Sequence, residues 1–357
     1  MENRLPLCKE QLKKIDVKFF LNELLEAIKY ISIFETKIQD SRLEQIVYLP
    51  KLEIGEVISS LKIEGIHTKI ENYYQEQLFS DGSNLDYQEM NNHMIALQKG
   101  TWLSMVYGFT NDVIKEIHKI LFSNVNSIKQ GILIGDYKRV NNYIGRDNIK
   151  IYTPPTFEET QMYMDDLIAF MNDNSIDVHP LIKCAIIHAQ FESIHPFEDG
   201  NGRIGRLLIP IYLCKSSLLD APLFYISEAI EKDKYLYYNS LTQTRGGNYN
   251  EWIKYFLKKC IIQSQKHIEL MDKIDKLYAK TTQEIEKITN SVVFPKLVKS
   301  IFINPIISSK KMADNLKVSI SQANRYLRCL EEAKILYKDD KKRNIIYYFG
   351  ELLDMIS

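Results

Sequence analysis

Residues 195–206 read His-Pro-Phe-Glu-Asp-Gly-Asn-Gly-Arg-Ile-Gly-Arg and separate two stretches that have the periodicity of helices. In the first stretch, apolar residues recur at positions 181, 182, 185, 186, 189 and 191. In the second, Ile204, Leu207, Leu208, Ile211 and Tyr212 resume the same spacing. Because apolar residues three and four positions apart line one face of a helix, the pattern predicts a loop that runs into a helix N-terminus.

The composition of this loop favours the binding of phosphate. Gly200 and Gly202 allow backbone N–H groups to point outward, and the dipole of the following helix adds positive potential. Arg203 and Arg206 lie about one turn apart, so both project from one side of the first turn. Phosphate groups bind at helix N-termini and N–H nests of this kind.

His195 could serve as a base at the mouth of this loop, and Asp199 is a carboxylate that could hold a cation. Each residue taken alone is more often structural, since a Gly-Asn-Gly is usually a turn. Their occurrence together at fixed spacing is difficult to explain as a turn. The loop therefore predicts a site of phosphoryl or nucleotidyl transfer.

The same residues resemble the motif of the Fic family, His-x-Phe-x-Asp/Glu-Gly-Asn-Gly-Arg-x-x-Arg, at every specified position. The resemblance implies a protein adenylyltransferase, which transfers AMP from ATP to a Ser, Thr or Tyr hydroxyl of a target protein. It implies His195 as general base and Asp199 as the ligand of Mg²⁺. It also implies a nucleotide-binding segment made of Phe197, Gly200, Asn201, Gly202, Arg203, Ile204, Gly205 and Arg206, with Phe197 packed inward as an anchor of the loop.

An upstream segment resembles the inhibitory helix of one Fic class, Ser/Thr-x-x-x-Glu-Gly/Asn, through Ser60, Glu64 and Gly65. Read locally, the segment is an ordinary helix that ends at Gly65. The resemblance implies that Glu64 pairs bidentately with Arg206 and takes the place of a terminal phosphate of ATP.

Two further features match the family. Residues 131–155 mix β-branched, aromatic and turn residues and predict a short hairpin. The resemblance identifies this hairpin as the Fic flap, on which an extended segment of the target protein would dock near residues 137–145. Tyr237 and Tyr238 resemble the tyrosine pair that lines the adenosine pocket of Fic enzymes, although aromatic residues here are also typical of a core.

The C-terminal region, residues 291–357, resembles a winged helix-turn-helix domain. It contains predicted helices at 294–302, 309–316 (opening on a capping Ser309) and 319–333, then two predicted strands. It carries 12 Lys and Arg against 7 Asp and Glu. A surplus of five positive charges favours DNA, but winged helices also bind proteins, and both partners stay open.

The composition limits the class of protein to which this chain can belong. The chain has 357 residues and 46 residues of each charge sign, so it has no overall electrostatic preference. Its five scattered cysteines do not suggest disulfide frameworks or zinc sites, and a reducing cytoplasm fits them best. We expect no signal peptide, because residues 1–11 carry charge and no apolar core. We expect no membrane partner, because no apolar run approaches the roughly 18 residues of a membrane span.

We therefore predict an all-α protein with a small flap hairpin and a C-terminal winged-helix domain. The predicted domains are residues 1–105 (N-terminal helical region), 106–260 (catalytic core), 261–290 (helical linker) and 291–357. Helices are expected at 17–34, 45–61, 87–105 and 250–289, with a boundary between two helical pieces at Pro50. The resemblance also implies a homodimer.

Three other activities stay open. The same site could remove AMP from a modified protein, with Glu64 positioning a water. It could transfer another phosphate-containing group, although families that do so deviate in the motif. The chain could instead be a nucleotide-sensing regulator that binds DNA, but a sensor would not need both His195 and Asp199.

Overall fold

The computed structural model describes residues 4–40, 45–79, 84–123, 131–146, 149–289, 293–341 and 343–356. Helices dominate and strands are short, which confirms the predicted mainly helical class. The N-terminal part contains α1 (Cys8–Leu12), a 3₁₀ turn (Val17–Phe20), α2 (Leu21–Asp40), α3 (Gln45–Ile63), α4 (Ile70–Phe79), α5 (Leu85–Tyr107) and α6 (Asn111–Leu121). The middle contains β1 (Ile144–Arg146), β2 (Ile149–Tyr152), α7 (Phe157–Asn172), α8 (Pro180–Ile194), α9 (Asn201–Lys215), α10 (Ser227–Glu231), α11 (Lys234–Arg245) and α12 (Tyr249–Ile288).

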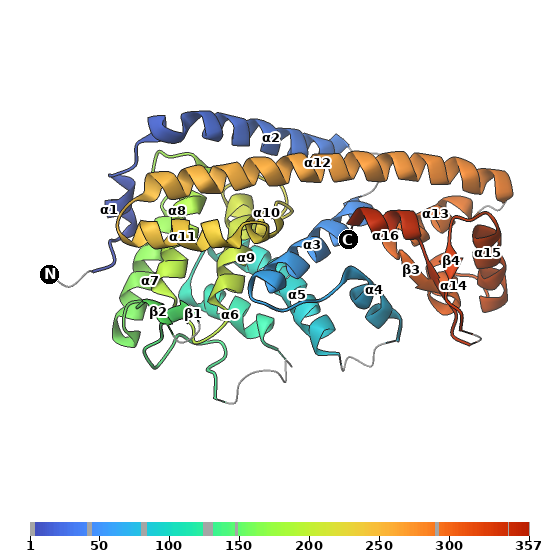
Figure 1. Cartoon of the computed structure of the whole chain (residues 1–357), viewed down its shortest axis with the longest axis horizontal. Coiled ribbons are helices and arrows are strands. Elements are labelled where there is room, and N and C mark those ends of the chain that lie inside the picture. Colours follow the sequence, from blue (N-terminus) through green and yellow to red (C-terminus); the bar gives the residue numbers. More distant parts are fainter. Residues whose placement is uncertain are drawn as a thin grey trace.

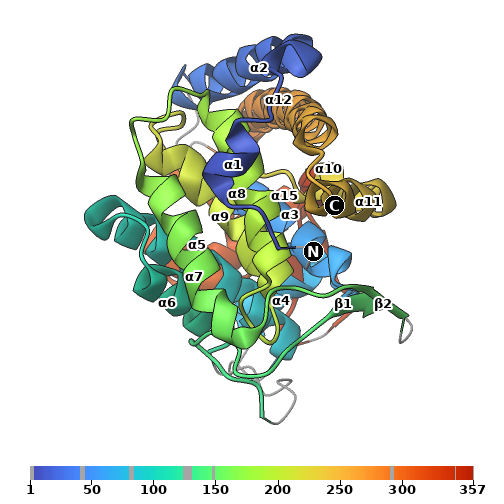
Figure 2. The ribbon, with the colours of Figure 1, turned by 90° about the vertical axis from the view of Figure 1, so that its left-hand side faces the viewer.

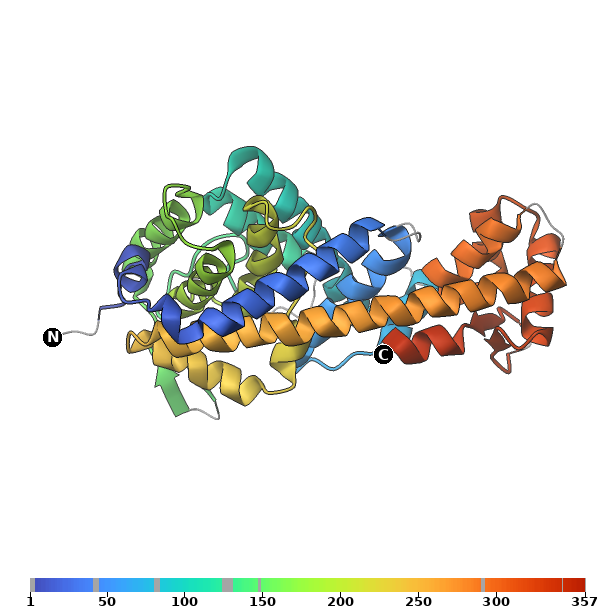
Figure 3. The same ribbon diagram turned by 90° about the horizontal axis from the view of Figure 1, so that it is seen from above.

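The helix α12 is 40 residues long and links the body around α8 to the C-terminal elements (Figure 1). It matches the predicted helix at 250–289. The helix α2 lies along it, as Figure 3 shows from above. Residues at three- and four-residue spacing form the buried stripe of α2: Leu24, Ala27, Ile31, Phe34 and Ile38. The predicted helix at 17–34 is thus a 3₁₀ turn followed by a helix that continues to Asp40.

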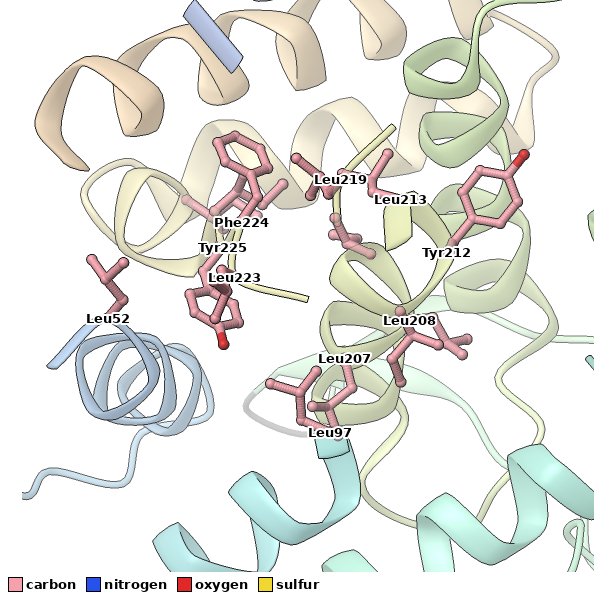
Figure 4. Packing of buried hydrophobic residues seen from close by; sticks show 14 of the residues in the cluster. Leu52, Leu97, Leu207, Leu208, Tyr212, Leu213, Leu219, Leu223, Phe224 and Tyr225 are labelled. Carbon is pink, nitrogen blue, oxygen red and sulfur yellow. The ribbon is translucent and has the colours of Figure 1, made fainter. Parts of the chain in front are cut away.

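The centre of the body is α8, in which every residue from Leu181 to Ile194 is buried. A helix without a polar face must be covered on all sides, here by α7, α9, α11 and α12 among others. The indole N–H of Trp252 on α12 donates to the Ala185 carbonyl at 2.7 Å. Figure 4 shows Leu207 and Leu208 of α9 in this core, with Leu207 beside Leu97 of α5.

The helix α3 runs from Gln45 to Ile63 without interruption, so the predicted boundary at Pro50 is wrong. Proline removes one backbone hydrogen bond of a helix, at a cost of about 3 kcal/mol. Burial of apolar side chains along the rest of α3 offsets that cost, since each contributes about 1.5–3 kcal/mol. The buried side chains include Leu52, Ile54, Val57 and Leu61.

The predicted hairpin is present as β1 and β2, which pair antiparallel with Arg146 opposite Ile149. Figure 2 shows it projecting at the edge of the body. The connecting residues 147 and 148 lie outside the described residues. Residues 137–143, which the prediction included in the docking segment, form no strand.

The C-terminal elements are α13 (Phe294–Ile303), β3 (Ile306–Ser308), α14 (Ser309–Leu316), α15 (Ile320–Glu332), β4 (Tyr337–Lys338), β5 (Ile346–Tyr348) and α16 (Gly350–Ile356). The three predicted helices and two predicted strands are all present. The cap of α14 is Ser308 instead of Ser309, because the Ser308 hydroxyl accepts from the Lys311 N–H. The prediction missed β3, which pairs with β5, and the final helix α16. The assignment as a winged helix stays a prediction.

Among the described residues, no helix combines the length and apolarity needed to cross a membrane. The predicted domain boundary at 260 falls inside α12, and the one at 290 falls outside the described residues. The domain division stays a prediction.

Candidate active site

His195 is the residue at which α8 ends. Its backbone N–H donates to the Phe191 carbonyl at 3.0 Å, and its φ of 49° places it in the left-handed region. The chain therefore turns away from the helix axis at this point and starts the loop. The imidazole is only partly covered, whereas the α8 side chains before it are buried.

Two asparagines hold the loop in one conformation. The Asn201 side chain accepts from the Phe197 N–H and donates to the Phe197 carbonyl, both at 2.8 Å. The Asn142 amide donates to the carbonyls of His195 and Phe197 at 3.2 and 3.0 Å. Both polar atoms of the Asn201 side chain are thus bonded within the loop. Asn201 therefore holds the loop in shape.

Phe197 is fully buried beneath the loop, as predicted, and stacks on His118 of α6 with ring centroids 3.9 Å apart. The Gly135 N–H donates to Nδ1 of His118 at 3.0 Å, so the proton of this imidazole is on Nε2. That Nε2–H donates to the Asp199 carbonyl at 3.1 Å. His118 therefore supports the loop from below. The sequence offered only a lone histidine in an amphipathic helix, which is no signal for this role.

Three glycines of the motif lie where a Cβ would crowd a neighbour, an aromatic ring at Gly200 and the flexible ends of carboxylates at Gly202 and Gly205. A Cβ at Gly200 would lie 2.5 Å from the Phe122 ring. At Gly202 it would lie 2.4 Å from the Glu64 carboxylate, and at Gly205 it would lie 2.3 Å from the Glu192 carboxylate. Gly200 also has a φ of 77°. Ile204, in contrast, is buried, so its side chain faces the core and only its backbone could contact a nucleotide.

Arg206 is the best anchored residue of the motif. Its Nε donates to the Ser60 hydroxyl at 2.9 Å, and one terminal nitrogen donates to the Ser60 carbonyl at 3.0 Å and to Glu64 Oε1 at 2.7 Å. Ser60, Glu64 and Arg206 are thus brought together from α3 and α9. The pair is not the bidentate one we predicted, because the Ser60 contacts occupy Nε. Gly65 follows with a φ of 88° as α3 ends.

The ion pair is reflected in the electrostatics of both partners. Burial by itself would raise the pKa of Glu64, but Arg206 lowers it overall. Burial by itself would lower the pKa of Arg206, but Glu64 raises it overall. The Arg206 side chain is 1% exposed and that of Glu64 is 36% exposed. Glu64 therefore supplies the negative charge that this buried guanidinium needs.

Arg203 also lies at the start of α9. Its guanidinium is 4.6 Å from the centroid of the Phe122 ring, and it is 4.0 Å from the carboxylate of Glu89 on α5. Both arginines are therefore positioned by buried contacts before any ligand binds.

His195 is uncharged at neutral pH. Burial lowers its pKa to about 4, and the nearby cations Lys138 and Arg245 act in the same direction. Its Nδ1 is buried and has no hydrogen-bond partner among the described residues. A neutral imidazole has a free lone pair and can accept a proton.

Sequence reasoning missed the supporting roles of Lys138 and Arg245. Lys138 donates its N–H to the Pro196 carbonyl at 2.8 Å, and its Nζ donates to Asn142 Oδ1 at 2.9 Å. Arg245 lies 3.9 Å from the centroid of the Tyr152 ring in β2. Lys138 thus contacts the motif loop and Arg245 contacts the hairpin, from two distant segments that a linear motif cannot reveal.

Asp199 is exposed at the loop surface, and one carboxylate oxygen accepts from the Gly200 N–H at 2.6 Å. The described residues contain no cluster of three His, Cys, Asp or Glu side chains that could hold a metal ion. A single carboxylate suits Mg²⁺, which in nucleotide sites binds one or two carboxylates plus substrate phosphates. The donor set fits Mg²⁺ brought by a nucleotide.

The tyrosine pair is divided between core and surface. Tyr237 is buried, and its hydroxyl is 2.9 Å from Nε2 of His188, whose Nδ1 is 2.9 Å from the Gly205 carbonyl. Since a carbonyl only accepts, His188 donates from Nδ1 and accepts from Tyr237. Tyr238 is 46% exposed, with its ring centroid 5.2 Å from that of Tyr237. Tyr237 therefore supports the start of α9 from within, and Tyr238 is the one available at the surface.

Residues 108–213 match the model of the Fic/DOC family. A protein adenylyltransferase of Caenorhabditis elegans is 27% identical over 45% of this chain and 29% of that protein. A probable protein adenylyltransferase of Aquifex aeolicus is 26% identical over 57% of this chain and 53% of that protein. The chain thus spans about half or less of these relatives.

Solved structures share the fold. A Fic family protein of Desulfovibrio desulfuricans has a TM-score of 0.62 at 17% identity, over 94% of this chain and 97% of that one. A Fic domain-containing protein of Bacteroides thetaiotaomicron has a TM-score of 0.57 at 23% identity, over 69% of this chain and 97% of that one. The chain therefore has the Fic fold, with a Fic/DOC family match at residues 108–213 and protein adenylyltransferases among its relatives at modest identity.

Proposed function

We propose that this protein is an adenylyltransferase that moves AMP from ATP to a hydroxyl side chain of a target protein, and that Glu64 inhibits it. The observation that carries the proposal is the loop itself. It places a neutral His195 at one end and the buried, positively charged Arg206 at the other, with close-packed glycines between them. Relatives named as protein adenylyltransferases support the same reaction.

In the proposed reaction the target hydroxyl attacks the α-phosphorus of ATP. A P–O bond forms to the hydroxyl oxygen, the bond to pyrophosphate breaks, and the hydroxyl proton passes to His195. Arg203 and Arg206, together with N–H groups at the start of α9, would stabilise the negative charge of the phosphates. Asp199 would hold Mg²⁺, which when bound neutralises charge on the α- and β-phosphates.

The negative charge of bound phosphates would also raise the pKa of His195. Its pKa is low in the free protein because burial, Lys138 and Arg245 disfavour the cation. Phosphate groups nearby favour the cation, so the pKa of the base would rise toward the working pH once ATP is bound. A base whose pKa lies near the working pH transfers protons most effectively.

Glu64 would act as the inhibitor because it occupies the guanidinium that a terminal phosphate would need. Its carboxylate lies against Arg206 and next to Gly202. While it stays there, ATP would bind with its α-phosphate poorly aligned for attack. The hairpin, whose first strand starts at Ile144, would dock an extended segment of the target along its edge.

The experiment is intact-protein mass spectrometry after incubation with ATP and Mg²⁺, with the Glu64→Gly variant included to relieve inhibition. We expect a gain of one AMP by self-modification, and no gain in a Glu64→Gly/His195→Ala control. If Glu64→Gly binds ATP without any transfer, to itself or to added protein, the adenylyltransferase proposal is wrong and nucleotide sensing takes its place. Loss of AMP from pre-modified protein would identify the reverse reaction.

A further inference from the structure

A cavity of about 410 Å³ lies along α3, between α3, the start of α4, α10, α12 and the end of α16. This is a size typical of small-molecule sites. Its wall includes the apolar residues Leu52, Ile58, Ile70, Leu270, Met355 and Ile356. It also includes Tyr225, which precedes α10 and lies beside α3 in Figure 4.

Gly55 leaves this cavity open. It lies inside α3 and lines the cavity, and a Cβ built there would meet no atom within 4 Å. Glycine destabilises a helix interior by about 1 kcal/mol relative to alanine. No close contact requires it here, in contrast to the three glycines of the motif. Gly55 therefore leaves open space in the cavity, next to its apolar wall.

Besides Oγ1 of Thr68, which can both donate and accept, two polar atoms of the wall are buried and have no hydrogen-bond partner among the described residues. The first is the Tyr225 hydroxyl, on a side chain 2% exposed. The second is Nδ1 of His267, on a side chain 5% exposed. A buried polar atom without a partner costs about 1–3 kcal/mol. A bound ligand could supply the hydrogen-bond partner that each of these two atoms lacks among the described residues.

The neighbours of His267 define what that partner must be. Gln263 accepts from the Ala229 N–H through Oε1, which fixes the orientation of its amide. Its Nε2 therefore donates to Nε2 of His267 at 2.8 Å. Burial lowers the pKa of His267 to about 3, so the ring carries one proton, which must be on Nδ1. His267 and the hydroxyl of Tyr225 are both donors, and they require an acceptor.

Two of the three carboxylates of the wall, Glu56 and Glu228, already have donors. Both oxygens of Glu56 accept from Ser227, one from its N–H at 3.0 Å and one from its hydroxyl. Glu228 pairs with Lys266. Lys51 also lines the cavity and donates to the Phe302 carbonyl at 2.6 Å, and burial lowers its pKa to about 7. A carboxylate placed here would favour the charged form of Lys51.

We propose that this cavity binds a small organic monocarboxylate with an apolar body, whose head group accepts from Tyr225 and His267 while its body packs on the apolar wall. The chemistry selects an anionic acceptor over a cation, since an ammonium group has no lone pair for these donors.

Occupancy has a consequence for the candidate active site, which rests on the proposed function. Glu56 lines the cavity, and Ser60 and Glu64 follow it at four-residue spacing on α3. A ligand that fits the cavity as it stands stabilises this position of α3, in which Glu64 is bound to Arg206. The carboxylate is therefore an inhibitor. At ten times its dissociation constant it should slow AMP transfer up to about tenfold.

The binding test uses calorimetric titration of the full chain with octanoate, octylammonium, 1-octanol and inorganic phosphate. We expect octanoate to bind, 1-octanol to bind at least fivefold more weakly, and octylammonium and phosphate not to bind. Gly55→Ala should retain octanoate binding, and Gly55→Phe should abolish it by filling the cavity. Tyr225→Phe should weaken it at least fivefold, which keeps the test valid if Gly55→Phe fails to fold.

Octanoate that does not bind, binds as well as octylammonium, or binds Gly55→Phe as it binds the wild type would overturn the proposal. These results need no enzymatic activity, so they are separate from failure of the proposed function. The activity arm compares AMP transfer with and without octanoate in the wild type and in Glu64→Gly. Inhibition confined to the wild type supports the link through α3, and equal inhibition of both proteins refutes that link.

Discussion

The motif loop, residues 195–206, and the C-terminal elements, residues 294–356, use their polar side chains in different ways. In the loop, several polar groups are buried and bonded to backbone, as with Asn201 on Phe197 and Arg206 on the Ser60 carbonyl, while Asp199 is exposed. In the C-terminal elements, Ser308 and Ser319 cap helices, whereas the arginines of α15, Arg325 and Arg328, are exposed to solvent.

The difference indicates what each region can do. Buried, bonded groups fix the positions of reacting atoms before a ligand arrives, which is what catalysis requires. Exposed cations on one helix can only be used by a partner large enough to reach them. The loop is thus suited to chemistry on a small molecule, and the C-terminal elements are suited to docking.

The largest effect should come from His195→Ala. The base acts on the acceptor hydroxyl and not on the nucleotide, so AMP transfer should fall at least about 100-fold while ATP binding is largely kept. Radiolabelled AMP incorporation and ATP titration measure the two quantities. Undiminished transfer would remove the base role, and loss of ATP binding would mean that His195 shapes the loop instead.

Glu64→Gly should have the next largest effect, in the opposite direction. Removing the carboxylate frees Arg206, which keeps its Ser60 contacts. Transfer should rise tenfold or more if a barrier of about 1.4 kcal/mol is released. Arg206→Ala should not mimic this, because it removes the phosphate ligand along with the inhibitory contact. Equal initial rates for wild type and Glu64→Gly at saturating ATP would refute inhibition by this contact.

Much of this arrangement could be predicted from the sequence, for identifiable reasons. The helices before and after the loop follow from apolar spacing, and the glycines lie where neighbours leave no room for a Cβ. The Fic motif led to Glu64, which is 142 residues from Arg206 along the chain.

The features of the fold and of the candidate site that the sequence did not predict depend on tertiary contacts, which no local pattern encodes. His118 acts through stacking on Phe197, and Arg245 acts through its charge near His195. Pro50 was read as a break because its local cost is real, yet the packing of α3 outweighs it. The strand β3 has only three residues, too few to show an alternating pattern.

Substitution of the exposed arginines of α15 should have a smaller effect, on DNA binding, that distinguishes the C-terminal elements from the motif loop. If the C-terminal elements dock on DNA, Arg325→Ala and Arg328→Ala should each weaken duplex binding by a few fold and reduce the slope of log affinity against log salt by about 0.9. Mobility shift or fluorescence anisotropy across a salt series measures both. Neither change should alter AMP transfer. No binding to duplex DNA at low salt would assign these elements to protein recognition.

The smallest effect should be that of mild acid on the loop. With its pKa lowered to about 4, His195 stays mostly neutral at pH 5.5, where an ordinary imidazole of pKa about 6.5 is mostly protonated. Because the neutral form is the base, kcat/KM for ATP in Glu64→Gly should change less than about twofold between pH 7 and pH 5.5, and should fall only as pH approaches 4. Arg245→Gln removes one of the cations that lower this pKa, so its acid limb should move to higher pH. Initial rates of AMP incorporation at ATP concentrations well below KM give both profiles. An acid limb near pH 6.5 in Glu64→Gly would show that the buried surroundings of His195 do not govern its protonation, and that the loop is as open to solvent as the arginines of α15.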